Sequence, residues 1–232
     1  MRGLLTVALA PVLLAQALHV RRVTPRLPGA SGPVTGSVPG GDPLRLLVLG
    51  ESTVDGVGAA THEEALTGQL ALALAERTGR GVRWQAVGRT GANARVVRTD
   101  LLPAAEPADL VVIALGVNDT IELHSAARYR RDLLRLVVAI RRGLGPVPVL
   151  LAGVPPMDRF PVLPRPLRAV LGARSAALDA AAVRLTRVPG VGHAPMPSEI
   201  LADDLFAADG FHPGPAGYRK WAAQLAQTVT AG

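Results

Sequence analysis

The chain of 232 residues lacks cysteine, which excludes disulfide bonds, a thiolate nucleophile and cysteine-ligated metal sites. Aromatic residues make up only 3% of the chain, so few side chains can stack on nucleic-acid bases. Lys220 is the only lysine among the 25 basic residues, and the net charge is +7. Because no recognisable nucleic-acid module accompanies this charge, we expect no nucleic-acid partner.

Charged residues are also missing from residues 3–18, which are mainly apolar. This run is intermediate in length between the core of a signal peptide and a membrane-spanning helix. The tripeptide Ala15-Gln16-Ala17 resembles a cleavage site, whereas the arginines that follow the run favour retention in the membrane. We therefore expect residues 1–20 to be a membrane anchor, with a cleaved signal peptide and secretion as the alternative. The side of the membrane stays open.

The remaining chain divides into a connecting segment and one domain. Residues 21–41 are rich in proline and glycine, a composition typical of a linker. Residues 42–232 are long enough for a single α/β domain with a full core.

The most informative stretch of this domain surrounds Ser52. Residues 44–49 form an almost wholly apolar run that ends at Gly50, as in a parallel strand covered on both faces. Ser52 then lies just past the carboxyl end of the strand, where open α/β sheets bind ligands. Serine beside glycine is also ordinary loop composition, so this position alone does not identify a nucleophile.

A second motif makes the nucleophile hypothesis stronger. Asp209 lies three residues before His212, close enough for the carboxylate to orient the imidazole. A serine hydroxyl becomes a good nucleophile when a base takes its proton and a third group holds that base. Ser52, His212 and Asp209 can supply these three roles.

Two further predicted strands end in polar loops that contain glycine. Residues 82–87 lead to Gly91, and residues 108–115 lead to Asn118. Parallel strands deliver such loops to one edge of the sheet, where hydrogen-bond donors can stabilise an oxyanion. The candidate donors are the backbone N–H groups of Ser52 and Gly91 and the side-chain amide of Asn118. Further strands are expected within residues 147–154 and 188–197.

The helical segments between the strands carry few other candidates. Thr61 and Glu64 have the spacing of a capping box, which predicts a helix from Thr61 to Gly79, with His62 on its surface. His193 has no acidic residue close by in sequence, so His212 is the preferred base. The helix expected over residues 126–142 carries many arginines, which indicate a solvated face or, as the minority interpretation, contact with anionic lipid.

Residues 155–163 are too apolar for an ordinary solvent-exposed loop. They are expected to line an acyl pocket, to form a lid or to pack against the core. The first of these interpretations favours acyl or lipid-like substrates.

Four blocks in order resemble those of the SGNH hydrolases, also called the GDSL-type esterase and lipase superfamily. They are Gly50-Glu51-Ser52, Gly91, Gly116-Val117-Asn118-Asp119 and Asp209-Gly210-Phe211-His212. The resemblance implies a three-layer α/β/α sandwich with a flavodoxin-like, five-stranded parallel sheet. It implies Ser52 as nucleophile, His212 as base, Asp209 as its partner, and Ser52, Gly91 and Asn118 as the oxyanion hole. Glu51 departs from the family pattern, which has aspartate there.

The sequence thus predicts a serine hydrolase that cleaves carboxylic esters through an acyl-enzyme. Small-molecule or lipid esters are the expected substrates, with no cofactor and no metal. The motifs do not choose among simple esters, lipids, thioesters and acetylated sugars. Two alternatives from other classes are a nucleotide-binding α/β module and a catalytically inactive membrane-associated scaffold.

Overall fold

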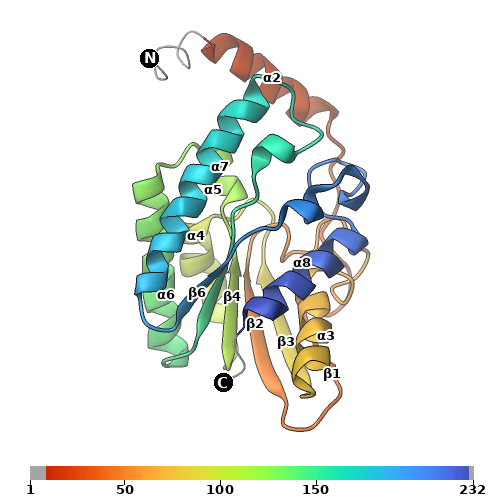
Figure 1. Ribbon diagram of the computed structural model, residues 1–232, viewed down its shortest axis with the longest axis vertical. Helices are drawn as coiled ribbons and strands as arrows, with labels where there is room; N and C mark the ends of the chain where they lie inside the picture. The colour runs from red at the N-terminus through yellow and green to blue at the C-terminus, as the bar shows by residue number, and fades with distance from the viewer. Residues whose placement is uncertain (1–8, 230–232) are drawn as a thin grey trace.

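A six-stranded sheet lies between two layers of helices in the computed structural model, which describes residues 9–229 (Figure 1). The predicted α/β/α sandwich is confirmed. The strand order is β1-β3-β2-β4-β5-β6, and every neighbouring pair except β1 and β3 is parallel. The strands are β1 (Thr35–Val38), β2 (Leu44–Gly50), β3 (Val82–Gly88), β4 (Leu110–Ala114), β5 (Val149–Ala152) and β6 (Val191–Ala194).

The helices connect the strands and cover both faces of the sheet. They are α2 (Ala10–Val23), α3 (Leu66–Thr78), α4 (Ala94–Val96), α5 (Val117–Ile121), α6 (Ala126–Leu144), α7 (Leu167–Val183) and α8 (Pro215–Thr228). A π-helical turn, Val97–Leu101, continues α4, and single 3-10 turns occur in the loops.

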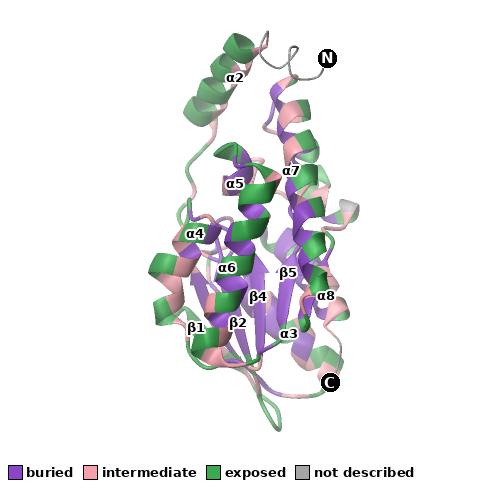
Figure 2. Ribbon diagram, turned by 90° about the vertical axis from the view of Figure 1, so that its left-hand side faces the viewer, coloured by how far each residue is buried: buried purple, intermediate pink, exposed green. Residues whose placement is uncertain are grey.

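The two faces of the sheet follow from the alternation of side chains along each strand. Leu47 and Leu49 of β2 join the core beneath α4, α6 and α7. Leu46 and Val48 of the same strand join the core beneath α3 and α8. Both faces are therefore buried, which explains why the central strands are continuous apolar runs (Figure 2).

The sheet has one strand more than the five that were expected. Residues 35–38, inside the segment predicted to be a linker, form β1 and pair antiparallel with the edge of β3. Gly36 permits this pairing because a Cβ atom there would overlap the indole ring of Trp84. The pairing depends on a partner almost 50 residues away in sequence, so composition could not reveal it.

The start of α3 also differs from the prediction. The helix begins at Leu66 and not at Thr61, although Thr61 Oγ1 does accept a 3.4 Å hydrogen bond from the Glu64 amide. The His62 amide donates to the carbonyl of Ser31, which holds this turn outside the helix. The expected end at Gly79 is confirmed, with φ of 69° in the left-handed region.

α6 has the buried stripe that its sequence predicts, and it ends at Leu144, just past the expected residue 142. Its inner residues include Tyr129, Leu133, Val137 and Ile140, whereas arginines dominate its outer face. Within residues 9–229, no helix combines the length and the apolar content needed to cross a bilayer. Part of the expected anchor, residues 1–8, lies outside the described residues.

Candidate active site

Ser52 lies in the tight turn that follows β2, and it is almost fully buried. Gly50 makes the turn possible, because a Cβ atom at that position would overlap the carbonyl oxygen of Ala114 on the adjacent strand. The Ser52 carbonyl accepts a 3.0 Å hydrogen bond from the Val57 amide. These contacts hold the serine at the carboxyl edge of the sheet, as predicted.

The loop before α8 brings His212 to Ser52. His212 Nε2 lies 2.9 Å from Ser52 Oγ, and His212 Nδ1 lies 2.6 Å from Asp209 Oδ2. The loop is closed by a 2.8 Å hydrogen bond from the Ala207 amide to the His212 carbonyl. Residues 160 positions apart in the chain thus form one hydrogen-bonded series.

Asp209 is held as a carboxylate by its surroundings. Its Oδ1 atom accepts the backbone amides of Phe211 at 2.9 Å and His212 at 3.0 Å. Burial acts to raise the pKa of Asp209, but the hydrogen bonds from the His212 ring and these amides prevail and lower the pKa. An ionised Asp209 accepts the Nδ1 proton of His212. This tautomer leaves Nε2 free to accept the proton of the Ser52 hydroxyl.

The loops that carry Gly91 and Asn118 lie against each other. Asn118 Nδ2 donates to the carbonyl of Ala92 at 2.9 Å, which joins the loop after β4 to the loop after β3. Gly91 has φ of 83°, a conformation that favours glycine. The roles of Ser52, Gly91 and Asn118 as oxyanion donors stay a prediction.

Asp55 and Glu51 join these loops to the serine turn. Thr90 donates to Asp55 Oδ2 through its amide at 3.0 Å and its hydroxyl at 2.6 Å. Glu51 accepts the amides of Val117 at 3.0 Å and Asn118 at 2.9 Å. The turns after β2, β3 and β4 are therefore linked to one another by side chains.

Glu51 has a structural role that the sequence did not reveal. Its side chain is buried beneath the first turn of α5. Burial raises the pKa of Glu51 to about 8, and the nearby Asp119 adds to this, against the lowering effect of the amide hydrogen bonds. Glu51 thus places a carboxyl group with a strongly raised pKa in the position next to the nucleophile.

A pocket opens at Ser52 and His212 and is lined mostly by apolar side chains. The walls come from the segment after β5, the 3-10 turns before His212 and the start of α5. They include Val117, Pro155, Phe160, Met196, Ile200, Leu201, Phe206 and Phe211.

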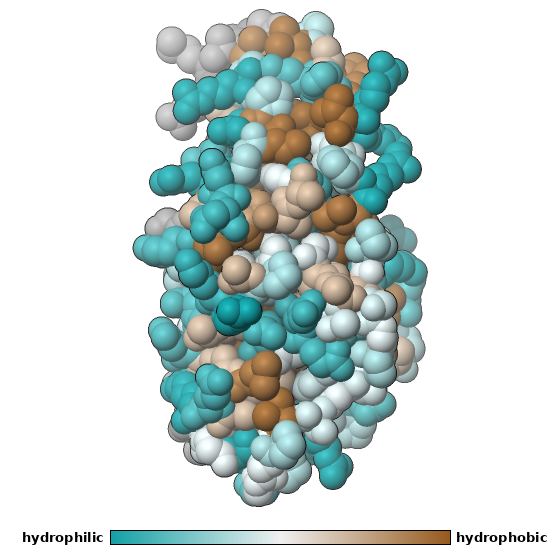
Figure 3. Space-filling model, turned by 90° about the vertical axis from the view of Figure 1, so that its right-hand side faces the viewer, coloured by the Kyte–Doolittle hydropathy of each residue, from teal (hydrophilic) through white to brown (hydrophobic). Residues whose placement is uncertain are grey.

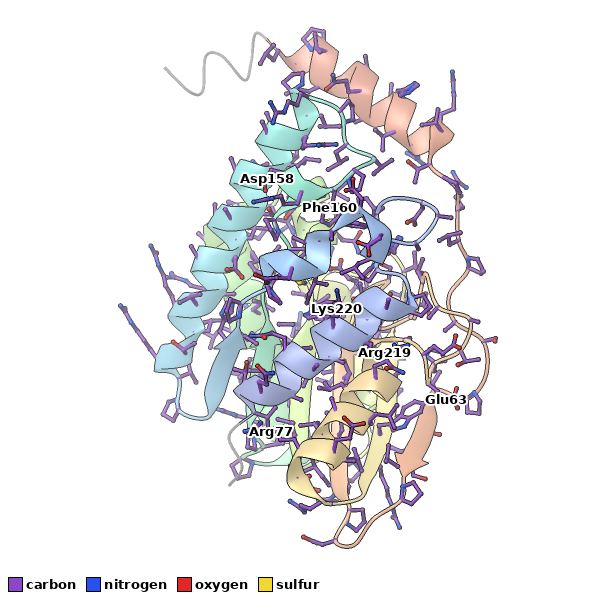
Figure 4. The ribbon with its side chains drawn as sticks, turned by 45° about the vertical axis from the view of Figure 1, so that its right-hand side comes forward. Glu63, Arg77, Asp158, Phe160, Arg219 and Lys220 are labelled. Carbon is purple, nitrogen blue, oxygen red and sulfur yellow. The ribbon has the colours of Figure 1, made fainter. Side chains whose placement is uncertain are left out.

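Residues 155–163 line the pocket and also pack against the core, which are two of the three interpretations given above. Phe160 lines the pocket and packs edge-on against Phe206 and Phe211, with ring centroids 5.6 and 5.0 Å apart. Met157 and Leu163 are buried in the small apolar cluster behind it. Figure 4 shows Phe160 on this segment, at the end of the molecule that α2 covers.

The other histidines near the sheet have different surroundings from those expected. His62 was predicted at the surface, but it is buried, and burial lowers its pKa. His193 does have an acidic partner, because α7 places Asp179 Oδ1 2.9 Å from His193 Nε2. His124 is paired with Asp119 at 2.7 Å and Glu122 at 3.0 Å. Within residues 9–229, only His212 is hydrogen-bonded to Ser52.

Among residues 9–229, no group of three or more histidine, aspartate or glutamate side chains is placed so that it could hold a metal ion.

Comparisons with known proteins show the family of the chain. Residues 48–220 match the model of the GDSL-like lipase/acylhydrolase family. A GDSL-like esterase of Mycobacterium tuberculosis is 29% identical, over 89% of this chain and 72% of that protein.

Solved structures share the fold at low sequence identity. A lipase from the goat rumen metagenome has a TM-score of 0.66 and 16% identity, covering 80% of this chain and 97% of its own. An extracellular lipase from Streptomyces rimosus has a TM-score of 0.60 and 20% identity, covering 81% of this chain and all of its own. The family match spans most of the domain and includes Ser52, Asn118 and His212. The chain belongs to the GDSL-like lipase/acylhydrolase family and is a carboxylic ester hydrolase.

Proposed function

We propose that this hydrolase works through an acyl-enzyme on Ser52, with His212 and Asp209 completing a catalytic triad. The observation that carries the proposal is the series Ser52 Oγ, His212 Nε2, His212 Nδ1 and Asp209 Oδ2, with separations of 2.9 and 2.6 Å. In this geometry His212 removes the hydroxyl proton while Oγ attacks the ester carbonyl carbon. Asp209 stabilises the imidazolium that forms.

The remaining steps use the same groups. The tetrahedral intermediate collapses when His212 returns the proton to the leaving alkoxide, which departs as the alcohol. A water molecule then gives its proton to His212 and attacks the acyl carbon, and the acid is released as Ser52 Oγ regains a proton. Neither step requires a metal or an organic cofactor.

The oxyanion hole of the proposal consists of the Ser52 and Gly91 amides and the Asn118 side chain. Asn118 Nδ2 uses one hydrogen for the Ala92 carbonyl, which leaves the second for an oxyanion. The links through Glu51 and Asp55 hold the three loops together before substrate arrives. Donors held in this way lower the barrier because they need no reorganisation during the reaction.

The apolar lining of the pocket favours esters with an apolar acyl group as substrates. Its walls beside Ser52 are formed by Phe160, Ile200, Phe206 and other apolar side chains. Burial of each methylene group in such a site contributes about 0.8 kcal/mol. Acyl or lipid-like esters are therefore favoured over acetylated sugars, whose hydroxyl groups need polar partners.

The decisive experiment compares the wild type with Ser52→Ala and His212→Ala, using a fluorophosphonate probe and p-nitrophenyl esters of increasing chain length. We expect labelling to disappear in Ser52→Ala and turnover to fall by about 10⁴-fold or more in both variants. Thermal unfolding shows whether each variant is folded. A folded Ser52→Ala protein that still hydrolyses esters overturns the assignment, and a folded wild type without labelling or turnover favours the inactive scaffold.

A further inference from the structure

Helix α2 is attached to the domain by one narrow stripe of residues. Leu13 and Val20 pack against the apolar cluster that contains Met157 and Phe160. The side-chain amide of Gln16 lies between them, where it donates to the carbonyl of Arg165 at 2.6 Å and accepts the Leu167 amide at 3.0 Å. These contacts place α2 across the start of α7, beyond the carboxyl edge of the sheet (Figure 1).

The rest of α2 is exposed, and none of its residues is fully buried. Leu14 and Leu18 lie opposite the attached stripe, because a helix turns about 100° per residue, and we call them the outer face of α2; they are 62% and 57% exposed. Val12 and Val23, 45% and 53% exposed, lie on a flank of the helix beside the stripe. Residues 10–18 contain no charged residue. Brown apolar side chains are accordingly visible at the upper end of the molecule, where α2 lies (Figure 3).

The exposed side of α6 is a solvated helix face of this protein with which the outer face of α2 can be compared. Most of its exposed positions are arginines, among them Arg128, Arg131 and Arg135. α2 has the opposite character over most of its length, and exposed apolar residues that gather in this way indicate a surface that contacts another apolar phase.

The charges next to the outer face have one sign. Arg21 and Arg22 occupy the last turn of α2, and Arg26 follows soon after. The first acidic residue of the chain is Asp42, so residues 1–41 carry no negative charge. A cationic margin beside an exposed apolar face is complementary to a lipid surface with anionic headgroups.

We propose that α2 lies in the plane of an anionic lipid bilayer, with its outer face inserted at the boundary between headgroups and acyl chains. The helix has 14 residues and is therefore about 21 Å long, shorter than the hydrocarbon core of about 30 Å. Because Leu13, Gln16 and Val20 hold one flank on the protein, the opposite flank faces the bilayer. Insertion along this flank places the arginines at headgroup level.

The position of α2 also affects how a substrate could reach the pocket, and this part of the inference rests on the proposed function. Leu13 and Val20 pack on the same cluster as Phe160, and Phe160 also lines the pocket beside Ser52. A bilayer under α2 therefore lies close to the pocket wall. An ester dissolved in the membrane would reach the pocket without crossing much water.

The test is sedimentation of the full-length protein with vesicles of phosphatidylcholine alone or mixed with phosphatidylglycerol. We expect binding to the anionic vesicles that weakens as salt increases. The double variant Leu14→Glu/Leu18→Glu should reduce the partition coefficient at least tenfold, and Arg21→Gln/Arg22→Gln should reduce it severalfold on anionic vesicles only.

Two control variants separate α2 from other features of the surface. Leu72→Glu changes a leucine of α3 that is 41% exposed, and it should leave vesicle binding unchanged. Arg131→Gln/Arg135→Gln removes two charges from α6 and should have a smaller effect than the arginine pair of α2. Hydrolysis of a water-soluble acetate ester should be equal in all of these variants, so a failure of the proposed function would be seen separately.

Several results would overturn the inference. The first is a wild type that does not bind anionic vesicles, and the second is equal binding by Leu14→Glu/Leu18→Glu. A third is loss of binding in the α6 variant alone. A dimer that Leu14→Glu/Leu18→Glu dissociates, without vesicle binding, identifies a second copy as the occupant of the outer face. A mature protein that begins after Ala17 shows that this segment is a signal peptide.

Discussion

The carboxyl group of Glu51 accepts the backbone amide of Asn118 at 2.9 Å, so the residue before the nucleophile holds the turn that carries a proposed oxyanion donor. The second oxygen of Glu51 accepts the amide of Val117. One side chain thereby connects the end of β2 to the first turn of α5. The connection joins Glu51, the neighbour of Ser52 in sequence, to Asn118. Ser52 and Asn118 both belong to the proposed catalytic centre.

Replacement of Glu51 by glutamine should lower kcat by about 10- to 100-fold with little change in KM. Glutamine has one acceptor oxygen, so one of the two amides loses its partner and the Asn118 turn shifts. Removal of an oxyanion donor costs up to about 10³-fold in kcat, and displacement should cost less. The measurement is steady-state hydrolysis of a p-nitrophenyl ester.

Two further variants make this result specific. Glu51→Asp keeps a carboxyl group and should retain more activity than Glu51→Gln. Glu63→Gln changes an exposed glutamate near the start of α3 and should have no effect (Figure 4). Equal kcat in Glu51→Gln and the wild type would show that Glu51 does not position Asn118.

The stability of the protein should depend on pH through Glu51. Burial raises its pKa from 4.5 to about 8 in the folded protein. Between these values the unfolded chain has lost the proton and the folded protein keeps it, so stability falls as pH rises from 4.5 to 8 and is constant above. At 1.36 kcal/mol per pKa unit the upper limit is about 5 kcal/mol.

This dependence can be measured by chemical unfolding of the wild type and Glu51→Gln between pH 4 and pH 9. The free energy of unfolding of the wild type, minus that of the variant, should decrease across the window. A difference that is independent of pH would mean that Glu51 titrates alike in the folded and unfolded states.

Asp209→Asn should reduce kcat by about 10³- to 10⁴-fold, because the amide no longer fixes the tautomer in which His212 Nε2 accepts the serine proton. Asp179→Asn is a matched control, since Asp179 also lies 2.9 Å from a histidine nitrogen, that of His193. It should change kcat by less than threefold. Similar losses in the two variants would contradict the assignment of the triad to Asp209.

Phe160→Ala should reduce kcat/KM for an octanoate ester about tenfold more than for an acetate ester. Its ring lines the pocket and supports Phe206 and Phe211, so its removal takes apolar contacts from a long acyl chain. Phe160→Ala also leaves a buried cavity, which costs about 3–5 kcal/mol of stability. Phe160→Leu therefore serves as a milder second variant. Equal losses for both esters in the two variants would place the acyl chain elsewhere.

Local sequence was sufficient for the fold class and for the residues proposed to act. An apolar run that ends in glycine marks β2, because a buried parallel strand needs apolar residues on both faces and its turn needs glycine. Asp209 and His212 are three residues apart, so their contact depends on one short loop. Short-range patterns of this kind can be recognised without knowledge of the rest of the chain.

Contacts between distant segments decided the rest. Gly36 can pair with β3 because it has no Cβ atom to overlap the indole ring of Trp84. His62 is buried because its turn is hydrogen-bonded to Ser31 and to the start of α3. His193 meets Asp179 through the packing of α7 beside β6, and Glu51 meets Asn118 through the adjacency of β2 and β4. In each case the partner is set by how the strands are ordered and the helices packed, and no local pattern of residues encodes that arrangement.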